Sequence, residues 1–201
     1  MAIKKIGLLG GSFDPVHLAH TALADTASRA LALETVELIP ASAPWQRKPL
    51  SASAEHRIAM IKLAIADSPK LRLNPIEIER GGKTYTIDTL KELPQDAHYY
   101  WILGADQLAN FCSWHSWEEI AARAQLVVAQ RPGSGIAPPP ALERHLADLN
   151  RPLIHLAFEP MSISATDIRG RLAAGQTVDG LVDPAVARYI QQNKLYRTPI
   201  A

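Results

Sequence analysis

The sequence predicts an α/β protein of Rossmann-like type, in which a mostly parallel sheet carries helices on both faces. Short apolar runs typical of buried strands alternate with segments whose apolar residues recur at helical spacing through most of the 201 residues. The hydrophobic fraction of 47 % is also large enough for a sizeable core. We therefore expect residues 1–201 to form a single domain, with a small C-terminal helical part around 160–201.

The first strand is expected over residues 3–9, a short apolar run that stops at Gly10-Gly11 and so enters a tight turn. Apolar residues at helical spacing predict a helix over 23–31. The second strand is expected over 35–40, which is rich in β-branched and apolar residues. Prolines, serines and two basic residues are typical of a loop over 41–52.

Ser53 has the side chain of an N-cap, and it precedes a helix whose isoleucines fall on one face. Residues 71–79 are expected to be extended, and Gly81-Gly82 interrupts them. A short helix is expected over 85–93. These elements continue the alternation that favours crossovers between parallel strands.

The second half of the chain has three further expected strands. Ser116 and Glu119 resemble a capping box that opens a short helix. Asp183 and Pro184 supply an N-cap and a first-turn proline for a C-terminal helix. The strands are expected over 98–103, 126–130 and 152–158, with a surface loop over 131–140. In such sheets, ligands bind outside the carboxyl ends of the strands.

Composition excludes several classes of protein. The formal net charge is +1, from 21 basic and 20 acidic side chains, so a nucleic-acid partner is not expected. Cys112 is the single cysteine, which rules out a disulfide within the chain and fits a cytoplasmic location. Apolar runs are too short to span a bilayer, and the start of the chain does not have the pattern of a signal peptide.

Residues 10–20 have the composition of a phosphate-binding turn. Gly10-Gly11 lets the backbone approach a phosphate, and the helix that follows adds free N–H groups and a partial positive charge. His17 and His20 share one helical face, where their imidazoles can donate to phosphate oxygens. A purely structural turn and a metal-binding histidine pair are the alternatives, although a third metal ligand is not evident. Both the dinucleotide fingerprint and the P-loop pattern are absent.

A second candidate anion site lies near the C-terminus. Ser164 can cap the helix that follows it, and Thr166 and Arg169 fall in the first turns of that helix. A helix N-terminus, hydroxyls and an arginine together suit an anion. The alternative is an ordinary capped helix with an exposed arginine.

These two stretches resemble the nucleotidyltransferase superfamily, whose signatures are a glycine turn followed by His-x-Gly-His and, later, Ile-Ser-x-Thr-x-x-Arg. Ala19 departs from the first signature, because it stands where the family usually has glycine. The resemblance implies catalytic roles for His17, His20 and Arg169 on ATP phosphates, without a covalent enzyme intermediate. The ATP-binding residues that it implies are Gly10, Gly11, Ser12, Phe13, Gly104, Asp106, Ile163, Ser164, Thr166 and Lys48.

Residues 84–90, Gly104-Ala105-Asp106, the Trp114 segment and Arg131-Pro132-Gly133 follow in that order. Together with both end motifs they resemble the bacterial nicotinate mononucleotide adenylyltransferases over nearly the whole chain. The resemblance implies that ATP and nicotinate mononucleotide give nicotinate adenine dinucleotide and pyrophosphate in NAD biosynthesis. It also implies Mg²⁺ bound with ATP, without a protein ligand. The implied nicotinate mononucleotide contacts are Thr86, Trp114, His115, Trp117 as second choice to Trp114, and Arg131.

Several alternatives stay open from the residues alone. The tryptophans can be core residues, and Asp106 can be a helix cap instead of a ribose ligand. In the loop after the second strand, Gln46 stands where the family often has a basic residue, so Arg47 or Lys48 takes its place, with Lys48 favoured. Rival functions are a phosphopantetheine adenylyltransferase-like enzyme and a non-catalytic nucleotide-binding regulator. The preference for acid or amide at the pyridine, and a homo-oligomeric state, are left open.

Overall fold

A six-stranded parallel sheet forms the centre of the molecule in the computed structural model, which describes residues 3–44, 50–131, 133 and 135–197. The strand order is β4-β2-β1-β6-β7-β8, and all five neighbouring pairs are parallel. The strands are β1 (Lys4–Gly11), β2 (Thr35–Pro40), β4 (Leu71–Leu73), β6 (Ala97–Gly104), β7 (Gln125–Gln130) and β8 (Ile154–Ala157). The predicted mostly parallel sheet is confirmed.

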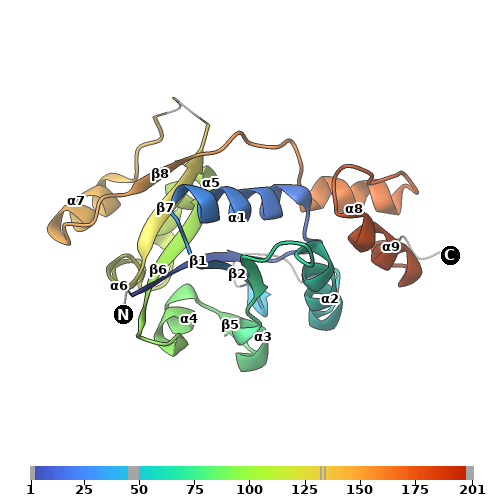
Figure 1. The fold of residues 1–201 in the computed structure, drawn as a ribbon, viewed down its shortest axis with the longest axis horizontal. Helices are drawn as coiled ribbons and strands as arrows, with labels where there is room; N and C mark the ends of the chain where they lie inside the picture. Colours follow the sequence, from blue (N-terminus) through green and yellow to red (C-terminus); the bar gives the residue numbers. More distant parts are fainter. Residues whose placement is uncertain (1–2, 45–49, 132, 134, 198–201) are drawn as a thin grey trace.

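Two hydrophobic cores lie on the two faces of this sheet. Leu8 and Leu9, neighbours on β1, point to opposite faces and join different clusters of buried side chains. Figure 1 shows α1 along one face and α4 on the other. The Leu9 core packs against α1 (Leu18–Ala30), α2 (Ala54–Ala64), α8 (Ala165–Ala173) and α9 (Pro184–Gln192), and the Leu8 core packs against α4 (Thr86–Glu92), α6 (Trp117–Arg123) and α7 (Pro140–Asp148).

The order of the strands reverses between β1 and β6, which both lie at the centre of the sheet. Chain segments leaving the carboxyl ends of these two strands therefore turn away from each other and leave a crevice. The crevice is where this type of fold binds ligands. None of the described helices is long and apolar enough to cross a membrane.

The expectation of an extended chain over 71–79 is wrong beyond β4. A short helix, α3 (Ile76–Arg80), begins after Pro75. The Asn74 Oδ1 atom accepts a hydrogen bond from the Ile76 N–H group at 3.1 Å, so an Asx turn starts the helix. The loop expected over 41–52 also contains β3 (Ala43–Pro44), which pairs in parallel with β5 (Lys83–Thr84).

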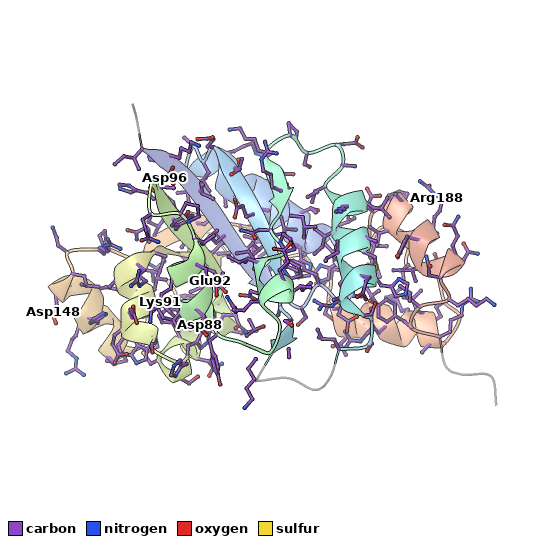
Figure 2. All side chains as sticks on the ribbon, turned by 90° about the horizontal axis from the view of Figure 1, so that it is seen from below. Asp88, Lys91, Glu92, Asp96, Asp148 and Arg188 are labelled. Atoms are coloured by element: carbon purple, nitrogen blue, oxygen red, sulfur yellow. The ribbon has the colours of Figure 1, made fainter. Side chains whose placement is uncertain are left out.

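The predicted capping box at Ser116 is wrong, although helix α6 does begin at Trp117. Ser116 adopts a left-handed backbone conformation with φ 53° and makes no side-chain capping bond. The Glu119 carboxylate contacts Lys91 and Arg123 instead. Figure 2 shows Lys91 and Glu92 at the surface of α4, where such exposed ion pairs add about 0–1 kcal/mol each.

Three other predicted N-caps are confirmed. Ser53, Ser164 and Asp183 each accept a hydrogen bond from a backbone N–H group in the first turn of the helix that they precede. The buried face of α2 differs from the expected isoleucine face, since it consists of Arg57, Met60 and Ile61. Sequence patterns did not predict α7 or the 3₁₀ turn η1 (Phe111–Ser113), whereas a helix behind Asp106 was one of the alternatives, and α5 (Ala105–Ala109) lies there.

Candidate active site

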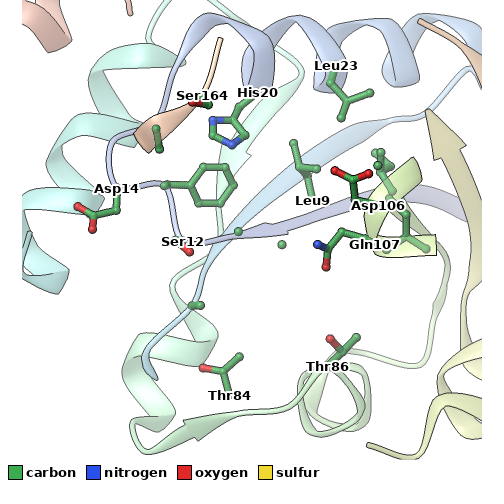
Figure 3. Close-up of a pocket in the computed structure, with 18 of the residues that line it drawn as sticks. Leu9, Ser12, Asp14, His20, Leu23, Thr84, Thr86, Asp106, Gln107 and Ser164 are labelled. Carbon is green, nitrogen blue, oxygen red and sulfur yellow. The ribbon is translucent and has the colours of Figure 1, made fainter. Parts of the chain in front are cut away.

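A cavity of about 870 Å³ lies at the carboxyl ends of β1 and β6. Figure 3 shows the β1–α1 turn on one side of it and Thr84 and Thr86 across from that turn. The cavity brings together most of the residues that the sequence singled out, from segments at both ends of the chain. The predicted residues that line it are Gly10, Gly11, Ser12, Phe13, His17, His20, Thr86, Gly104, Asp106, Trp114, His115, Ile163, Ser164, Thr166 and Arg169.

The glycines at the start of the β1–α1 turn lie close to aromatic side chains, which leave little room for a Cβ atom. A Cβ atom on Gly10 would lie 3.0 Å from the Trp101 ring, and one on Gly11 would lie 3.2 Å from the Phe13 ring. Both aromatic residues are buried and line the cavity. The small size of these residues thus lets two aromatic rings close the floor of the cavity, whether or not a ligand also approaches the backbone there.

The two histidines at the start of α1 stack on each other, with ring centroids 3.6 Å apart. The His17 backbone N–H group donates to the His20 Nδ1 atom at 3.2 Å. An imidazole nitrogen that accepts a hydrogen bond carries no proton, so the neutral His20 ring holds its proton on Nε2. The backbone therefore selects the tautomer in which His20 Nε2–H is a donor.

The His17 ring is 8 % exposed, and burial lowers its pKa to about 4. The ring is therefore neutral at pH 7. Its Nδ1 atom is buried and has no hydrogen-bond partner among the described residues. A buried polar atom without a partner is costly.

The backbone N–H groups at the start of α1 are less available for binding a phosphate than the sequence suggested. The Leu18 N–H group donates to the Leu181 carbonyl oxygen at 3.0 Å, and the His20 N–H group donates to the His17 carbonyl oxygen at 2.9 Å. These amides are engaged within the protein. The donors that this end of the cavity offers therefore come more from side chains than from the free amides expected at a helix N-terminus.

Arg169 reaches the same cavity from α8. Its Nη1 atom donates to the Asp14 carbonyl oxygen at 2.7 Å, and its Nη2 atom lies 3.4 Å from the Thr166 hydroxyl. The Ser164 hydroxyl accepts the Asp167 N–H group at 3.1 Å and so begins α8 beside the cavity. The fold thus brings a guanidinium into the same cavity as the histidine pair, although about 150 residues of sequence separate them.

The far end of the cavity is built around the start of α4 and the segment after η1. Thr86 is the first residue of α4, and the Tyr85 and His115 rings lie 5.0 Å apart. The Trp114 ring contacts Phe111, and its Nε1 atom is buried without a hydrogen-bond partner among the described residues. This wall offers an aromatic face and a hydroxyl.

Several polar residues of the lining were not among the predicted site residues, and they include Asp14, Glu77 and Gln107. Asp14 lies within the recognised turn, and Gln107 directly follows Asp106, so adjacency to a motif was the available signal. Glu77 had no such signal, because the pattern of 71–79 predicts an extended segment. Glu77 is 3 % exposed and accepts the Thr89 hydroxyl at 2.7 Å, and burial raises the pKa of its carboxyl to about 7.

Three predicted site residues are not placed at the cavity. The Trp117 ring packs between Phe111 and His145, so the core-packing alternative holds for it. Arg131 directly follows β7 and is exposed at the surface, where its side chain lies 3.7 Å from Glu159. Lys48 lies outside the described residues.

The cavity wall suits phosphate oxygens better than a bare metal ion. In the part of the chain that the structure describes, three or more His, Cys, Asp or Glu side chains do not come together as metal ligands. The Asp14 carboxylate is occupied by two backbone N–H groups and one hydroxyl. Hydroxyls, imidazoles and a guanidinium are the donors that phosphates accept.

Comparison with known proteins agrees with a cavity that binds phosphates. The cytidylyltransferase-like family model matches residues 8–171. A Bordetella pertussis protein named "Probable nicotinate-nucleotide adenylyltransferase" is 59 % identical over 197 residues, which cover 98 % of this chain and 100 % of that protein. A Chromobacterium violaceum protein of the same name is 41 % identical, over 96 % of this chain and 99 % of its own.

Among solved structures, Plasmodium falciparum nicotinic acid mononucleotide adenylyltransferase complexed with NaAD superposes with a TM-score of 0.76. The match covers 96 % of this chain and 97 % of that one, at 21 % sequence identity. At that identity the likeness concerns the fold alone.

Proposed function

The chain belongs to the cytidylyltransferase-like family and, within it, to the nicotinate-nucleotide adenylyltransferases, and we propose that it joins ATP and nicotinate mononucleotide. The products are nicotinate adenine dinucleotide and pyrophosphate. One observation carries this proposal. A single cavity has a histidine–arginine end that suits a polyphosphate and an aromatic end that suits a pyridine ring.

The phosphates of ATP bind at the histidine–arginine end. His20 donates from Nε2, Arg169 supplies a fixed positive charge, and the neutral His17 ring lines the cavity beside them. The hydroxyls of Ser164 and Thr166 complete this end. The remaining ATP contacts are assigned to Gly10, Gly11, Ser12, Phe13, Gly104, Asp106 and Ile163, with Lys48 kept as the proposed basic residue of its loop.

The acceptor binds at the aromatic end. The face of Trp114 lies against the pyridine ring, and Thr86 and the backbone N–H group of His115 meet the nicotinate carboxylate. Asp106, exposed at the start of α5, accepts from ribose hydroxyls. The interior packing of Trp117 and the surface position of Arg131 take both residues out of the proposed contact set.

In the reaction, a phosphate oxygen of nicotinate mononucleotide attacks the α-phosphorus of ATP in line. A new P–O bond forms, and the bond from the α-phosphorus to the bridging oxygen of pyrophosphate breaks. The attacking phosphate is already an anion near neutral pH, so a strong general base is not needed. Catalysis therefore comes from holding the two substrates in line and from stabilising charge on the transferring group and pyrophosphate.

Mg²⁺ is part of this proposal as a companion of ATP. The donors of the cavity fit phosphate oxygens, and the described acidic side chains do not form a metal cage. The ion would arrive with the triphosphate and would neutralise part of its charge. The protein's own residues orient the triphosphate through the imidazoles and the guanidinium.

The whole chain works as one catalytic domain in this proposal, because the C-terminal helical part supplies Arg169 to a cavity that begins at β1. The two partners are small molecules. A cytoplasmic location, expected from the single cysteine, belongs to the same proposal.

Pyrophosphate release from ATP tests the function directly. We expect release that depends on added nicotinate mononucleotide, with nicotinamide mononucleotide as the comparison acceptor and an acceptor-free reaction as the control. Release with phosphopantetheine alone would identify a different transferase. ATP binding without release for any acceptor would identify a non-catalytic regulator instead.

A further inference from the structure

Asp14 joins three distant parts of the chain at the edge of the cavity. Its side chain is buried, with 3 % exposure. The carboxylate accepts the backbone N–H groups of Ser51 at 2.7 Å and Ala52 at 3.0 Å, and also the Tyr196 hydroxyl at 2.7 Å. The loop before α2 and the segment after α9 therefore both hold the side chain of one residue in the β1–α1 turn.

The same residue holds the guanidinium of the cavity through its backbone. The Asp14 carbonyl oxygen accepts the Arg169 Nη1 atom at 2.7 Å. Arg57, which is almost fully buried, donates to the neighbouring Ser12 carbonyl oxygen at 2.9 Å and braces the turn from α2. The orientation of Arg169 thus depends on the position of a carbonyl group, and that position depends on what holds the Asp14 side chain.

Tyr196 is the side-chain donor to that carboxylate, and it comes from the far end of the sequence. Its backbone lies in the left-handed region with φ 62°, which is unfavourable for a tyrosine. Burial and the Asp14 carboxylate raise the pKa of its phenol well above the ordinary value, so the hydroxyl remains a donor at any physiological pH. The fold keeps an unfavourable backbone conformation while it delivers this one hydroxyl to Asp14.

We propose that Tyr196 is a positioning residue for the adenylyl transfer: its hydroxyl fixes Asp14, and Asp14 in turn fixes Arg169 at the phosphate end of the cavity. The inference rests on the proposed function and deepens it. It assigns a role to a residue that lies 182 positions from its partner in sequence and does not itself line the cavity. The role is distinct from packing, because it belongs to the hydroxyl and not to the ring.

The test compares Tyr196→Phe with Tyr189→Phe. Each variant removes one hydroxyl and keeps the ring. Tyr189 is a matched control, because its hydroxyl also joins the C-terminal region to α2, through His56 at 2.9 Å, but reaches no cavity residue. We expect Tyr196→Phe to lower kcat/KM for ATP about tenfold, since a small misplacement of a catalytic group has effects of this order or larger. The KM for nicotinate mononucleotide should stay within about twofold, and Tyr189→Phe should match wild type.

A double-mutant cycle with Arg169→Ala separates positioning from general loosening. If Tyr196 acts through Arg169, Tyr196→Phe causes no further loss in the Arg169→Ala background. The same tenfold loss in both backgrounds, or wild-type kinetics for Tyr196→Phe, would overturn the inference.

Calorimetric titration of ATP onto wild type and Tyr196→Phe keeps this inference apart from the proposed reaction. Weaker ATP binding by the variant supports the positioning role even if nicotinate mononucleotide turns out not to be the acceptor. Equal ATP affinity together with equal turnover contradicts the positioning role while leaving the proposed function intact.

Discussion

The two ends of the cavity are built in different ways. At the phosphate end, Asp14 and Arg169 are joined to each other and to the C-terminal segment by hydrogen bonds that span most of the sequence. At the pyridine end, ring contacts within the middle of the chain predominate, between Tyr85 and His115 and between Trp114 and its neighbours Phe111 and Trp101. The first end is fixed by hydrogen bonds between the two ends of the sequence, and the second by aromatic packing.

This difference assigns the two ends different kinetic roles. Groups that stabilise developing charge must be fixed before the reaction, so the heavily bonded phosphate end should control turnover. A pyridine ring needs an aromatic face to stack on and a donor for its carboxylate, and packed aromatic side chains beside a hydroxyl supply both. The pyridine end should therefore control the affinity for the acceptor more than the rate of transfer.

The largest expected effect is that of His20→Ala. Loss of one preorganised donor typically lowers turnover by about 10²- to 10³-fold, and we expect a loss of this size in kcat with the fold retained. His98→Ala is the control, because His98 lies at the opposite end of β6 from the cavity. Steady-state pyrophosphate release and a thermal melt measure both variants. Wild-type turnover in His20→Ala would remove this residue from the site.

His17 should make the folded protein sensitive to acid. Its pKa of about 4 in the folded chain lies below the ordinary value of 6.5, so the unfolded chain takes up the proton first as the pH falls. Stability from the neutral ring is complete above about pH 6.5 and is lost as the pH falls to about 4, by roughly 3 kcal/mol at most. Urea unfolding of wild type and His17→Asn at pH 7.5 and pH 4.5 checks this, since the variant should lose less stability between the two.

Glu77 should have the opposite pH dependence at the other end of the cavity. Its pKa of about 7 lies above the ordinary value of 4.5, so the folded state favours the protonated carboxyl. Stability is complete below about pH 4.5 and is lost as the pH rises through 7. Thr89, Arg80 and Glu92 are the groups around it that set this balance. We expect Glu77→Gln to stabilise the protein by about 2 kcal/mol at pH 8 and to have little effect at pH 5, as measured by urea unfolding. Equal stability of the two proteins at pH 8 would contradict this.

Trp114→Leu tests the pyridine end of the cavity, where the acceptor binds. The change keeps an apolar side chain but removes the aromatic face, and we expect the KM for nicotinate mononucleotide to rise about tenfold, with kcat changed by no more than about threefold. Trp117→Leu is the matched control, because its ring packs against Phe111 and His145 away from the lining. It should lower the melting temperature and leave that KM unchanged. A similar rise in KM for both variants would show that general loosening, not stacking, controls acceptor affinity.

Sequence patterns predicted the fold and the cavity where the signal is local. The glycine turn, the cap at Ser164 and the Gly104-Ala105-Asp106 segment each follow a strand or precede a helix, and strand order then brings them to one crevice. The prediction of an extended segment over 71–79 was wrong, because an Asx turn at Asn74 starts a helix that the spacing of apolar residues does not reveal.

Contacts between distant segments were outside the reach of sequence reasoning. The roles of Asp14 and Tyr196 depend on hydrogen bonds between residues far apart in the chain, and neither residue type stands out in its local pattern. The packing of Trp117 depends on α7, a helix that the sequence did not predict because it begins within a proline-rich segment. The tautomer of His20 depends on the orientation of one backbone N–H group, which composition and spacing do not determine.

The central claim is that His20 and Arg169, brought together from α1 and α8, act on one polyphosphate. A double-mutant cycle on pyrophosphate release, with His20→Ala, Arg169→Ala and the double variant, tests it most directly. We predict that the double variant loses far less activity than the product of the two single losses, because both groups stabilise the same transition state. A loss equal to that product, in variants that all remain folded, would contradict the account.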